Sequence, residues 1–171
     1  MRPAFAILGT AIFLVLAPGT VAGWIPWWIT RWRVQSPAIA RLPLWVSGAV
    51  LVAAGVVVLL DSFARFALKG LGTPVPVFPT QHLVVSGLYR YVRNPMYVAV
   101  LAVILGQALI FGSIGLLEYA AVAWLAAHVF VVAYEEPTLR ANFGAEYQAF
   151  RAAVPRWIPR LTPWHGNSHA G

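Results

Sequence analysis

Four long apolar runs, separated by polar or Gly/Pro-rich segments, dominate the pattern of hydrophobic and polar positions. They cover about residues 4–28, 42–63, 96–111 and 114–134. A membrane-spanning helix needs roughly 20 consecutive apolar residues, with about 17 as a practical minimum. The first, second and fourth runs reach this length. The third is shorter and contains Gln107, but the turn residues at 112–115 predict that runs three and four form a transmembrane helical hairpin.

The periodicity changes after the hairpin. Apolar residues then recur every three or four positions, at Leu139, Phe143, Tyr147, Phe150 and Val154. This spacing predicts an amphipathic helix over residues 137–154, of the kind that lies on a membrane or covers a site. Pro155 ends the helix, and the following tryptophan and prolines predict an irregular C-terminal segment.

The composition supports a membrane protein and excludes two other classes. The chain is 60% hydrophobic and only 10% charged, whereas an average soluble domain carries about 25% charged residues. So few charges could not cover a water-facing globule, and so apolar a chain is not disordered. The absence of cysteine excludes disulfides, thiol nucleophiles and cysteine-ligated metals. The sequence therefore predicts an all-α, multi-pass membrane protein with about four spans.

The basic residues are distributed unevenly about these spans. There are 12 basic residues and 5 acidic ones. In so apolar a chain, this excess predicts contact with membrane lipids rather than with nucleic acid. Four spans place nine basic residues beside the N-terminus, the 64–95 loop and the C-terminal tail, and three on the other side. The positive-inside rule then puts both termini and the amphipathic helix in the cytoplasm.

The predicted elements divide the chain into two parts. Residues 1–63 form the first two membrane helices. Residues 64–171 form the second part, with a cytoplasmic loop, the hairpin over 96–134 and the helix over 137–154. The first run also fits a signal peptide, because Arg2 precedes it and small residues occur at Thr20 and Ala22. We prefer a retained helix, since the run is long and continues into a tryptophan-rich segment. The oligomeric state is not indicated.

Polar residues gather where the third run begins. Asn94 is a good N-cap and Pro95 a good first helical residue. A helix N-terminus offers unpaired N–H groups and a partial positive charge, which suit a carboxylate or a phosphate. The alternative is a plain helix start with arginines that extend towards the interface.

Glu135, Glu136 and Pro137 follow the fourth run. Two acids at the edge of a bilayer are costly and by default suggest function; alternatively, they mark where the helix leaves the membrane. The hairpin brings Glu135 to the same end as Asn94. Amide donors on one wall and a carboxylate on the other fit a zwitterionic ligand, and nearby tyrosines offer faces for a purine or a sulfonium.

Five short motifs also occur in order between about residues 60 and 160. They are Leu83-Val84-x-x-Gly87-x-Tyr89, Arg93-Asn94-Pro95-x-Tyr97, Glu135-Glu136, Phe143-Gly144-x-x-Tyr147 and Val154-Pro155-Arg156. This set resembles the isoprenylcysteine carboxyl methyltransferase family, which groups with membrane phospholipid N-methyltransferases. The resemblance implies a multi-pass membrane enzyme that uses S-adenosylmethionine, releases S-adenosylhomocysteine, and methylates a lipid-like or hydrophobic acceptor at oxygen or nitrogen.

The resemblance also implies a set of cofactor-binding residues. They are His82, Leu83, Val84, Tyr89, the tetrapeptide Asn94, Pro95, Met96 and Tyr97, and Glu135. Two positions depart from the family pattern. The tetrapeptide commonly begins with histidine, and asparagine here cannot take a charge. The arginine that holds a prenylcysteine carboxylate, one turn before the acid, is Val131, so such a substrate would lose that partner.

Three further residues are the predicted catalytic side chains. His128 lies on the face of Glu135 within the apolar run, where a histidine is either a substrate contact or base, or a hydrogen-bonded helix–helix contact. Glu136 and Arg140 are four residues apart, so they pair or Arg140 attracts an anionic head group.

Methyl transfer from a sulfonium is an in-line displacement of an activated leaving group. It asks the protein to position and desolvate the partners, and no nucleophilic side chain or metal is required. We expect the cofactor to enter from the cytoplasm and the acceptor to arrive through the bilayer near His128. Two alternatives remain: a non-enzymatic small membrane transporter or assembly subunit, and an NADPH-dependent membrane reductase, against which the short chain argues.

Overall fold

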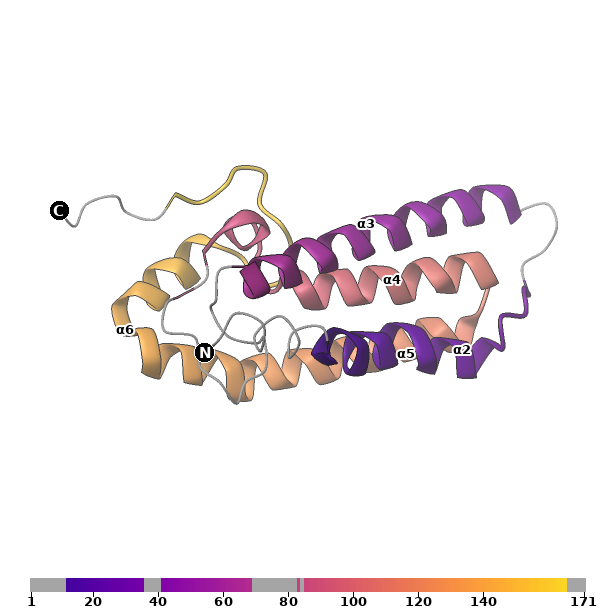
Figure 1. The fold of residues 1–171 in the computed structure, drawn as a ribbon, viewed down its shortest axis with the longest axis horizontal. Coiled ribbons are helices and arrows are strands. Elements are labelled where there is room, and N and C mark those ends of the chain that lie inside the picture. Colours follow the sequence, from indigo (N-terminus) through magenta and orange to yellow (C-terminus); the bar gives the residue numbers. More distant parts are fainter. Residues whose placement is uncertain (1–11, 36–40, 69–82, 84, 166–171) are drawn as a thin grey trace.

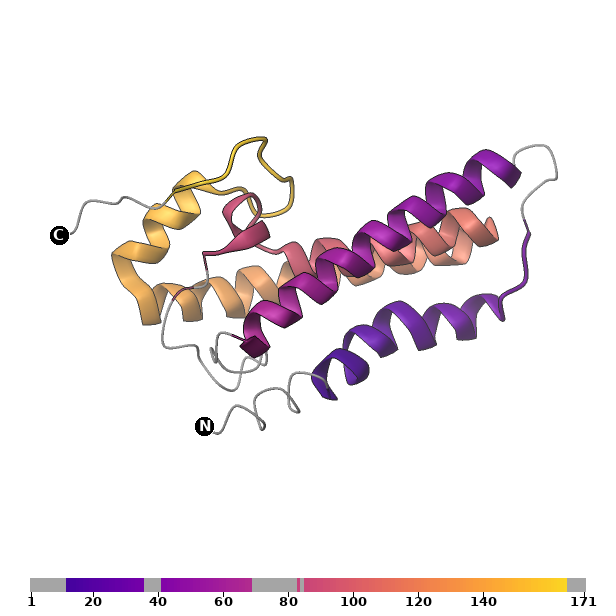
Figure 2. The same ribbon diagram turned by 45° about the horizontal axis from the view of Figure 1, so that its top comes forward.

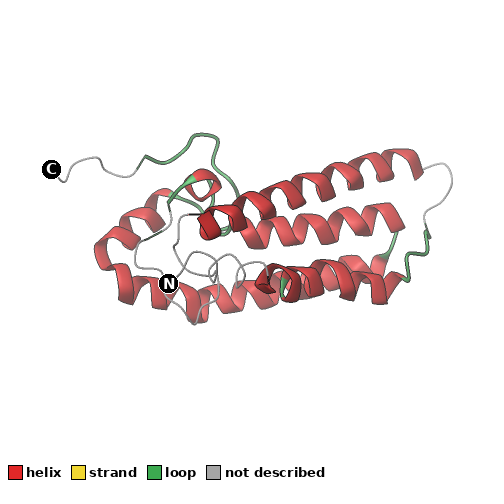
Figure 3. Ribbon diagram, viewed as in Figure 1, coloured by secondary structure: helices red, strands yellow, loops and turns green. Residues whose placement is uncertain are grey.

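The fold is built from helices that run back and forth along one long axis (Figures 1 and 3). This computed structural model describes residues 12–35, 41–68, 83 and 85–165, and all regular elements within these ranges are helical. The all-α prediction is therefore confirmed for this part of the chain. The elements are η1 (Thr20–Trp24), α2 (Ile25–Thr30), α3 (Arg41–Leu68), η3 (Gly87–Arg90), α4 (Pro95–Phe111), α5 (Ile114–Phe130), η4 (Val131–Glu135) and α6 (Glu136–Ala153).

Three helical segments are long and apolar enough to cross a membrane by length and composition. They are Ile12–Thr30, Leu42–Arg65 and Ile114–Ala153. The third predicted run forms α4, which is apolar but has only 17 residues. The chain is thus a membrane protein with three clear candidate spans, and a fourth crossing by α4 stays a prediction.

A tight turn joins α4 to α5 where the sequence predicted one. Gly112 adopts a left-handed conformation with φ of 61°, which ends α4. Ser113 then caps α5, because its Oγ accepts a hydrogen bond of 3.3 Å from the Leu116 N–H. The two helices return alongside each other, so the start of α4 and the end of α5 lie at the same end of the bundle.

Small residues let α3 and α4 approach very closely. A Cβ added to Gly48 would lie 2.5 Å from the carbonyl oxygen of Gly106, and one added to Gly55 would lie 2.7 Å from that of Ala99. The pairing runs in opposite directions along the two helices, which are therefore antiparallel. Small residues are how apolar helices gain van der Waals contact in lipid, where no hydrophobic drive exists between them. We call this contact the glycine seam.

Side chains of the hairpin hold the first helical segment. The π-helical turn η1 has carbonyl groups that accept hydrogen bonds from the hairpin, at 2.7 Å from Gln107 Nε2 to Ala22 and at 2.9 Å from the Tyr119 hydroxyl to Val21. Gln107 in the short apolar run is therefore a packing residue between helices.

The fourth run does not end at Tyr134. The helix continues through the π-helical turn η4 directly into α6, and α6 turns sharply at Gly144, whose φ is 49° (Figures 1 and 2). A helix over nearly the predicted range 137–154 is present, but it is kinked and continuous with α5. That it lies on the membrane surface stays a prediction.

The apolar stripe of α6 packs against the protein's own loops. Tyr147, Phe150 and Val154 are buried, and Leu83 and Trp164 pack against them. Beyond α6, the chain forms an ordered coil over residues 154–164, which we call the C-terminal strap. Its backbone bonds to the segment before α4, through Arg93 N–H to Pro155 O, Arg160 N–H to Tyr91 O and Trp164 N–H to Arg90 O.

Candidate functional site

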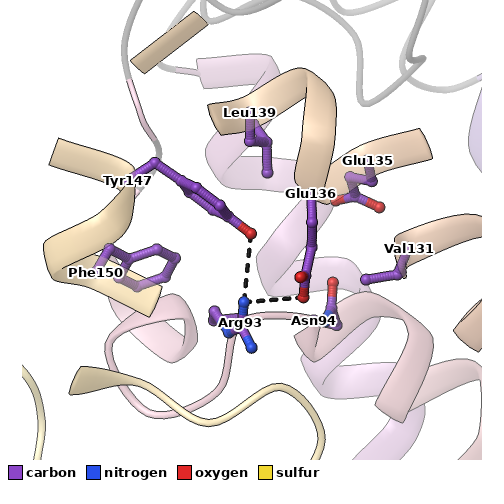
Figure 4. A pocket seen from close by; sticks show the side chains of 8 residues that line it. All are labelled: Arg93, Asn94, Val131, Glu135, Glu136, Leu139, Tyr147 and Phe150. Atoms are coloured by element: carbon purple, nitrogen blue, oxygen red, sulfur yellow. Dashed lines mark hydrogen bonds and ion pairs between the residues drawn. The ribbon is translucent and has the colours of Figure 1, made fainter. Parts of the chain in front are cut away.

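A pocket lies where the start of α4 meets η4 and α6 (Figure 4). Its cavity volume is about 20 Å³. A cavity of this volume has room for about one water molecule, so a larger ligand would extend beyond it. Its lining combines charged and apolar side chains: Arg93, Asn94, Val131, Glu135, Glu136, Leu139, Tyr147 and Phe150.

Glu136 is the centre of a charged network beside this pocket. Its Oε1 accepts from Arg93 Nη1 at 2.9 Å and from Arg156 Nε at 2.6 Å, while Oε2 accepts from Arg156 Nη2 at 3.1 Å. Arg151 Nε lies 3.7 Å from Oε2. Only 6% of the Glu136 side chain is exposed. The bond to Glu136 raises the pKa of Arg156 above its usual value, so this network holds both partners in their charged forms.

The π-helical turn η4 explains why Glu136 faces inwards. The backbone N–H of Glu136 donates a hydrogen bond to the carbonyl of Val131, which lies five residues earlier in the chain. In an α-helix, a residue five positions on would point away from Val131, but the wider π turn brings both to the same face. Val131 is 1% exposed and Glu136 is 5% exposed. The turn therefore carries a carboxylate into the interior at the point where α5 becomes α6.

Glu135 has a different environment from its neighbour. Its Oε2 accepts a hydrogen bond of 3.2 Å from the Tyr97 hydroxyl. Among the residues that the structure describes, no arginine or lysine lies within salt-bridge distance of Glu135. Burial raises the pKa of the Tyr89 phenol well above its usual value, and the charge of Glu135 acts in the same direction. Tyr89 therefore stays protonated near this carboxylate.

Asn94 occupies the predicted cap position but does not cap α4. Pro95 is the first helical residue, as expected, yet the Asn94 side chain accepts nothing from the helix. It is buried, and its Nδ2 donates a hydrogen bond of 3.1 Å to the carbonyl of Arg156. The prediction of a side-chain cap is therefore wrong, because the bond to the C-terminal strap holds the amide group in an orientation in which its oxygen meets no N–H of the helix. Asn94 instead fastens the strap to the pocket.

The structure brings together some of the predicted cofactor residues and separates others. Asn94 and Glu135 line the pocket, and Tyr97 bonds to Glu135. Met96 packs towards α3, and Leu83 packs against the buried face of α6. His82 and Val84 lie outside the described residues.

His128 lies among aromatic rings next to the strap. Its Nδ1 accepts a hydrogen bond of 3.1 Å from Trp157 Nε1, and its ring centroid is 5.3 Å from that of Trp124. Tyr97 meets Trp157 edge-on at 6.4 Å, which links this cluster to Glu135. One interpretation of His128 was a hydrogen-bonded contact between helices. The hydrogen bond is present, but its donor, Trp157, belongs to the strap and not to a helix. A role as a substrate contact stays a prediction.

Arg140 does not pair with Glu136. It is exposed, and the described partners of Glu136 are Arg93, Arg151 and Arg156. The i, i+4 pairing was plausible for isolated α-helix geometry, but Arg93 and Arg156, which lie outside α6, bond to both carboxylate oxygens. The alternative, attraction of an anionic head group by Arg140, stays a prediction.

Several residues of this site had no role predicted from the sequence. Arg93 and Arg156 belong to the quoted motifs, and Trp157 follows them directly. The small number of acids in the sequence could have indicated that these arginines pair with a glutamate. In a chain with five acids, a motif arginine needs one of very few partners, and a buried glutamate needs a cation.

Comparison with known proteins gives one match. The family model described as phospholipid methyltransferase matches residues 44–146, which include α4, the hairpin turn and both glutamates. No protein of curated function and no solved structure matches the chain.

Proposed function

Because the chain belongs to the phospholipid methyltransferase family and is therefore a membrane methyltransferase, we propose that S-adenosylmethionine is its methyl donor and a lipid-like molecule its acceptor. The observation that carries this proposal is the contrast at the pocket between two adjacent acids. Glu136 is neutralised by arginines, whereas the described partner of Glu135 is a phenol. A carboxylate in this position suits a cationic ligand group.

The donor set of the pocket fits the amino-acid end of that cofactor. Glu135 would bind the ammonium group, held in position by the Tyr97 hydroxyl at 3.2 Å. The first N–H groups of α4 lack helical partners and would face the carboxylate. Since the cavity has room for about one water molecule, most of the cofactor would lie outside it and extend past Tyr89 towards the cytoplasmic side. When bound, S-adenosylmethionine supplies a methyl group on a positively charged sulfur.

The chain's own residues would then position and shield the partners. Val131, Leu139 and Phe150 line the pocket with apolar surface and exclude water. Glu136 acts in this proposal as a positioning residue. It lines the pocket, but arginines bond to both of its carboxylate oxygens, and it ties the strap and the segment before α4 to α6.

The acceptor would approach from the side of the aromatic cluster. Trp124 is 41% exposed on an apolar helix, and its ring contacts both His128 and Trp157. We propose that a head group enters here, next to His128, with its apolar part in the bilayer. Arg140, exposed on α6, would attract an anionic group of the same lipid.

Binding of S-adenosylhomocysteine, the product formed from the cofactor, tests whether the pocket binds this cofactor. We expect S-adenosylhomocysteine, but not NADPH, to stabilise the purified protein against heat. Glu135→Gln should weaken S-adenosylhomocysteine binding at least tenfold by calorimetry, because the cationic end loses its counter-charge. Glu118→Gln is the matched control, since Glu118 is exposed near the other end of α5.

Three outcomes would contradict the proposal: unchanged binding in the Glu135 variant, stabilisation by NADPH, or no response of the wild type to either ligand. The acceptor is tested separately. Membranes incubated with cofactor carrying a labelled methyl group should yield a labelled lipid by mass spectrometry, and no labelled lipid should form with Glu135→Gln.

A further inference from the structure

We propose that the C-terminal strap, residues 154–164, inserts into the membrane interface, with Ile158 and Leu161 in contact with lipid acyl chains. These two side chains are 78% and 99% exposed, which is more than any other large apolar side chain that the structure describes. Both belong to the strap rather than to a helix that spans the bilayer.

The contacts of Trp157 fix the level of the strap along the membrane helices. Its ring lies 6.0 Å from that of His128 and 6.4 Å from that of Trp124, both on α5. At this level α5 exposes further apolar side chains, with Leu125 and Val129 each 55% exposed. Ile158 follows Trp157 directly. The strap therefore meets a candidate spanning helix at a level where that helix exposes apolar side chains.

The backbone of the strap suits the membrane interface, where water is still present, rather than the bilayer core. Among the described residues, the N–H groups of Ile158 and Leu161 have no backbone acceptor. Irregular backbone is tolerated at membrane depth only where its polar groups are satisfied by protein. Three of the strap's residues are prolines and have no N–H to satisfy: Pro155, Pro159 and Pro163. The N–H groups of Arg160 and Trp164 bond to carbonyls of the segment before α4, at 3.0 and 2.9 Å.

The strap is held in one conformation at several points. Arg156 bonds to Glu136, and Trp157 bonds to His128. Near its end, Arg90 Nε donates to the carbonyl of Trp164 at 2.8 Å, and Arg160 Nη1 donates to that of Ala153 at 2.9 Å. In Figures 1 and 2 the strap is the yellow coil that leaves α6 and passes beside η3. These bonds keep Ile158 and Leu161 from folding back onto the protein.

The charges of the strap agree with an interfacial position. It contains two arginines, Arg156 and Arg160, and no acid. Arg156 is neutralised within the protein, but the guanidinium of Arg160 has no acidic partner among the described residues. A cation beside exposed apolar side chains suits the boundary between acyl chains and anionic head groups. The expected partner is therefore the lipid bilayer.

The chain offers a clean test because it has no cysteine. Single cysteines replace Ile158 or Leu161 and carry a spin label in phosphatidylcholine–phosphatidylglycerol vesicles. The measurement compares relaxation by oxygen, which enters the bilayer, with relaxation by a water-soluble nickel complex. Val129→Cys serves as the lipid reference and Glu146→Cys as the polar reference, because Glu146 is exposed on α6.

We expect labels at positions 158 and 161 to be relaxed mainly by oxygen, as at position 129. Strong relaxation by the nickel complex at both positions, as at position 146, would overturn the proposal. Both sites are exposed, so substitution there leaves the packing intact, and binding of S-adenosylhomocysteine serves as a check on folding in a protein that binds it. The readout is position and not activity, so its failure is distinct from failure of the methyltransferase proposal.

Discussion

The pocket end of the molecule and the glycine seam hold together in opposite ways. At the pocket, Arg93, Glu136 and Arg156 join segments that are far apart in the chain through charged hydrogen bonds. Along the seam, Gly48, Gly55 and Gly106 bring two helix backbones into direct contact without a charged group. One region depends on charge neutralisation and the other on shape.

The difference follows from the surroundings of each region. In lipid, water does not drive helices together, so close packing is the remaining source of attraction. At the membrane interface, buried charges are tolerated only when they are paired and hydrogen-bonded. Two of the chain's five acids, Glu135 and Glu136, therefore lie at the pocket, where segments outside the spans are held together. The small residues of the seam lie where two helices touch.

The largest effect is expected when the charged network loses its centre. Glu136→Ala should destabilise the protein by about 3 kcal/mol, because it leaves Arg93 and Arg156 without a counter-charge. Arg93 is only 10% exposed, whereas Arg156 is 26% exposed and can recover some hydration. The measurement is chemical or thermal unfolding in detergent.

Glu146→Ala is the matched control for that variant, since Glu146 is exposed on the same helix. It should change stability by no more than about 0.5 kcal/mol. Equal effects of the two substitutions would show that the network does not hold the pocket end together. Glu135→Gln should fall close to this control in stability while losing ligand binding.

A smaller loss is expected from one methyl group in the seam. Gly106→Ala places a Cβ 2.6 Å from the carbonyl oxygen of Gly48, so the helices must separate. Overpacking costs typically 1–3 kcal/mol, partly offset by the better helix propensity of alanine, and we expect a net loss of about 1–2 kcal/mol. The same unfolding measurement applies.

Gly23→Ala makes the same chemical change where nothing lies within 4 Å of the new Cβ. It should leave stability unchanged or slightly improved. If both variants behave alike, close approach of α3 and α4 is not what stabilises the seam.

The smallest effect is expected at an ion pair outside both regions. Arg65 bonds to Asp61 through two hydrogen bonds of 2.8 Å within α3, and about a third of each side chain is exposed. Asp61→Asn should cost about 0.3–0.5 kcal/mol, as is usual for such i, i+4 pairs. Unfolding at low and high salt checks this; a loss above about 2 kcal/mol would place Asp61 among the essential charges of the molecule.

The helices were predictable because their signals are local. Apolar runs and the turn residues at 112–115 located α3, α4 and α5 within a few residues. The continuation of α5 into α6 was not predictable in the same way. Pro137 marks a helix start in most sequences, but here the π-helical turn η4 precedes it, so the helix does not end.

The site was predictable only in part. The hairpin places Asn94 and Glu135 at one end of the bundle, and both line the pocket. Their partners were not deducible, because Tyr97 meets Glu135 across 38 residues of sequence and Arg156 meets Asn94 across 62. The same holds for Trp157, which meets His128 across 29 residues. Local spacing cannot report such contacts, and it favoured Arg140 for Glu136 where the fold supplies arginines from other segments.

The π-helical turn at Val131–Glu135 makes this enzyme sensitive to length as well as to side-chain chemistry. An α-helix advances by about 100° per residue, so removing one residue from the turn would rotate all of α6 by that angle relative to α5. No side chain of the charged network would need to change, yet Glu136 would swing away from Arg93, and the strap would be carried with α6. The single extra residue of the π turn thus fixes the rotation of α6 relative to α5. The alignment of the membrane helix, the pocket and the strap depends on this rotation.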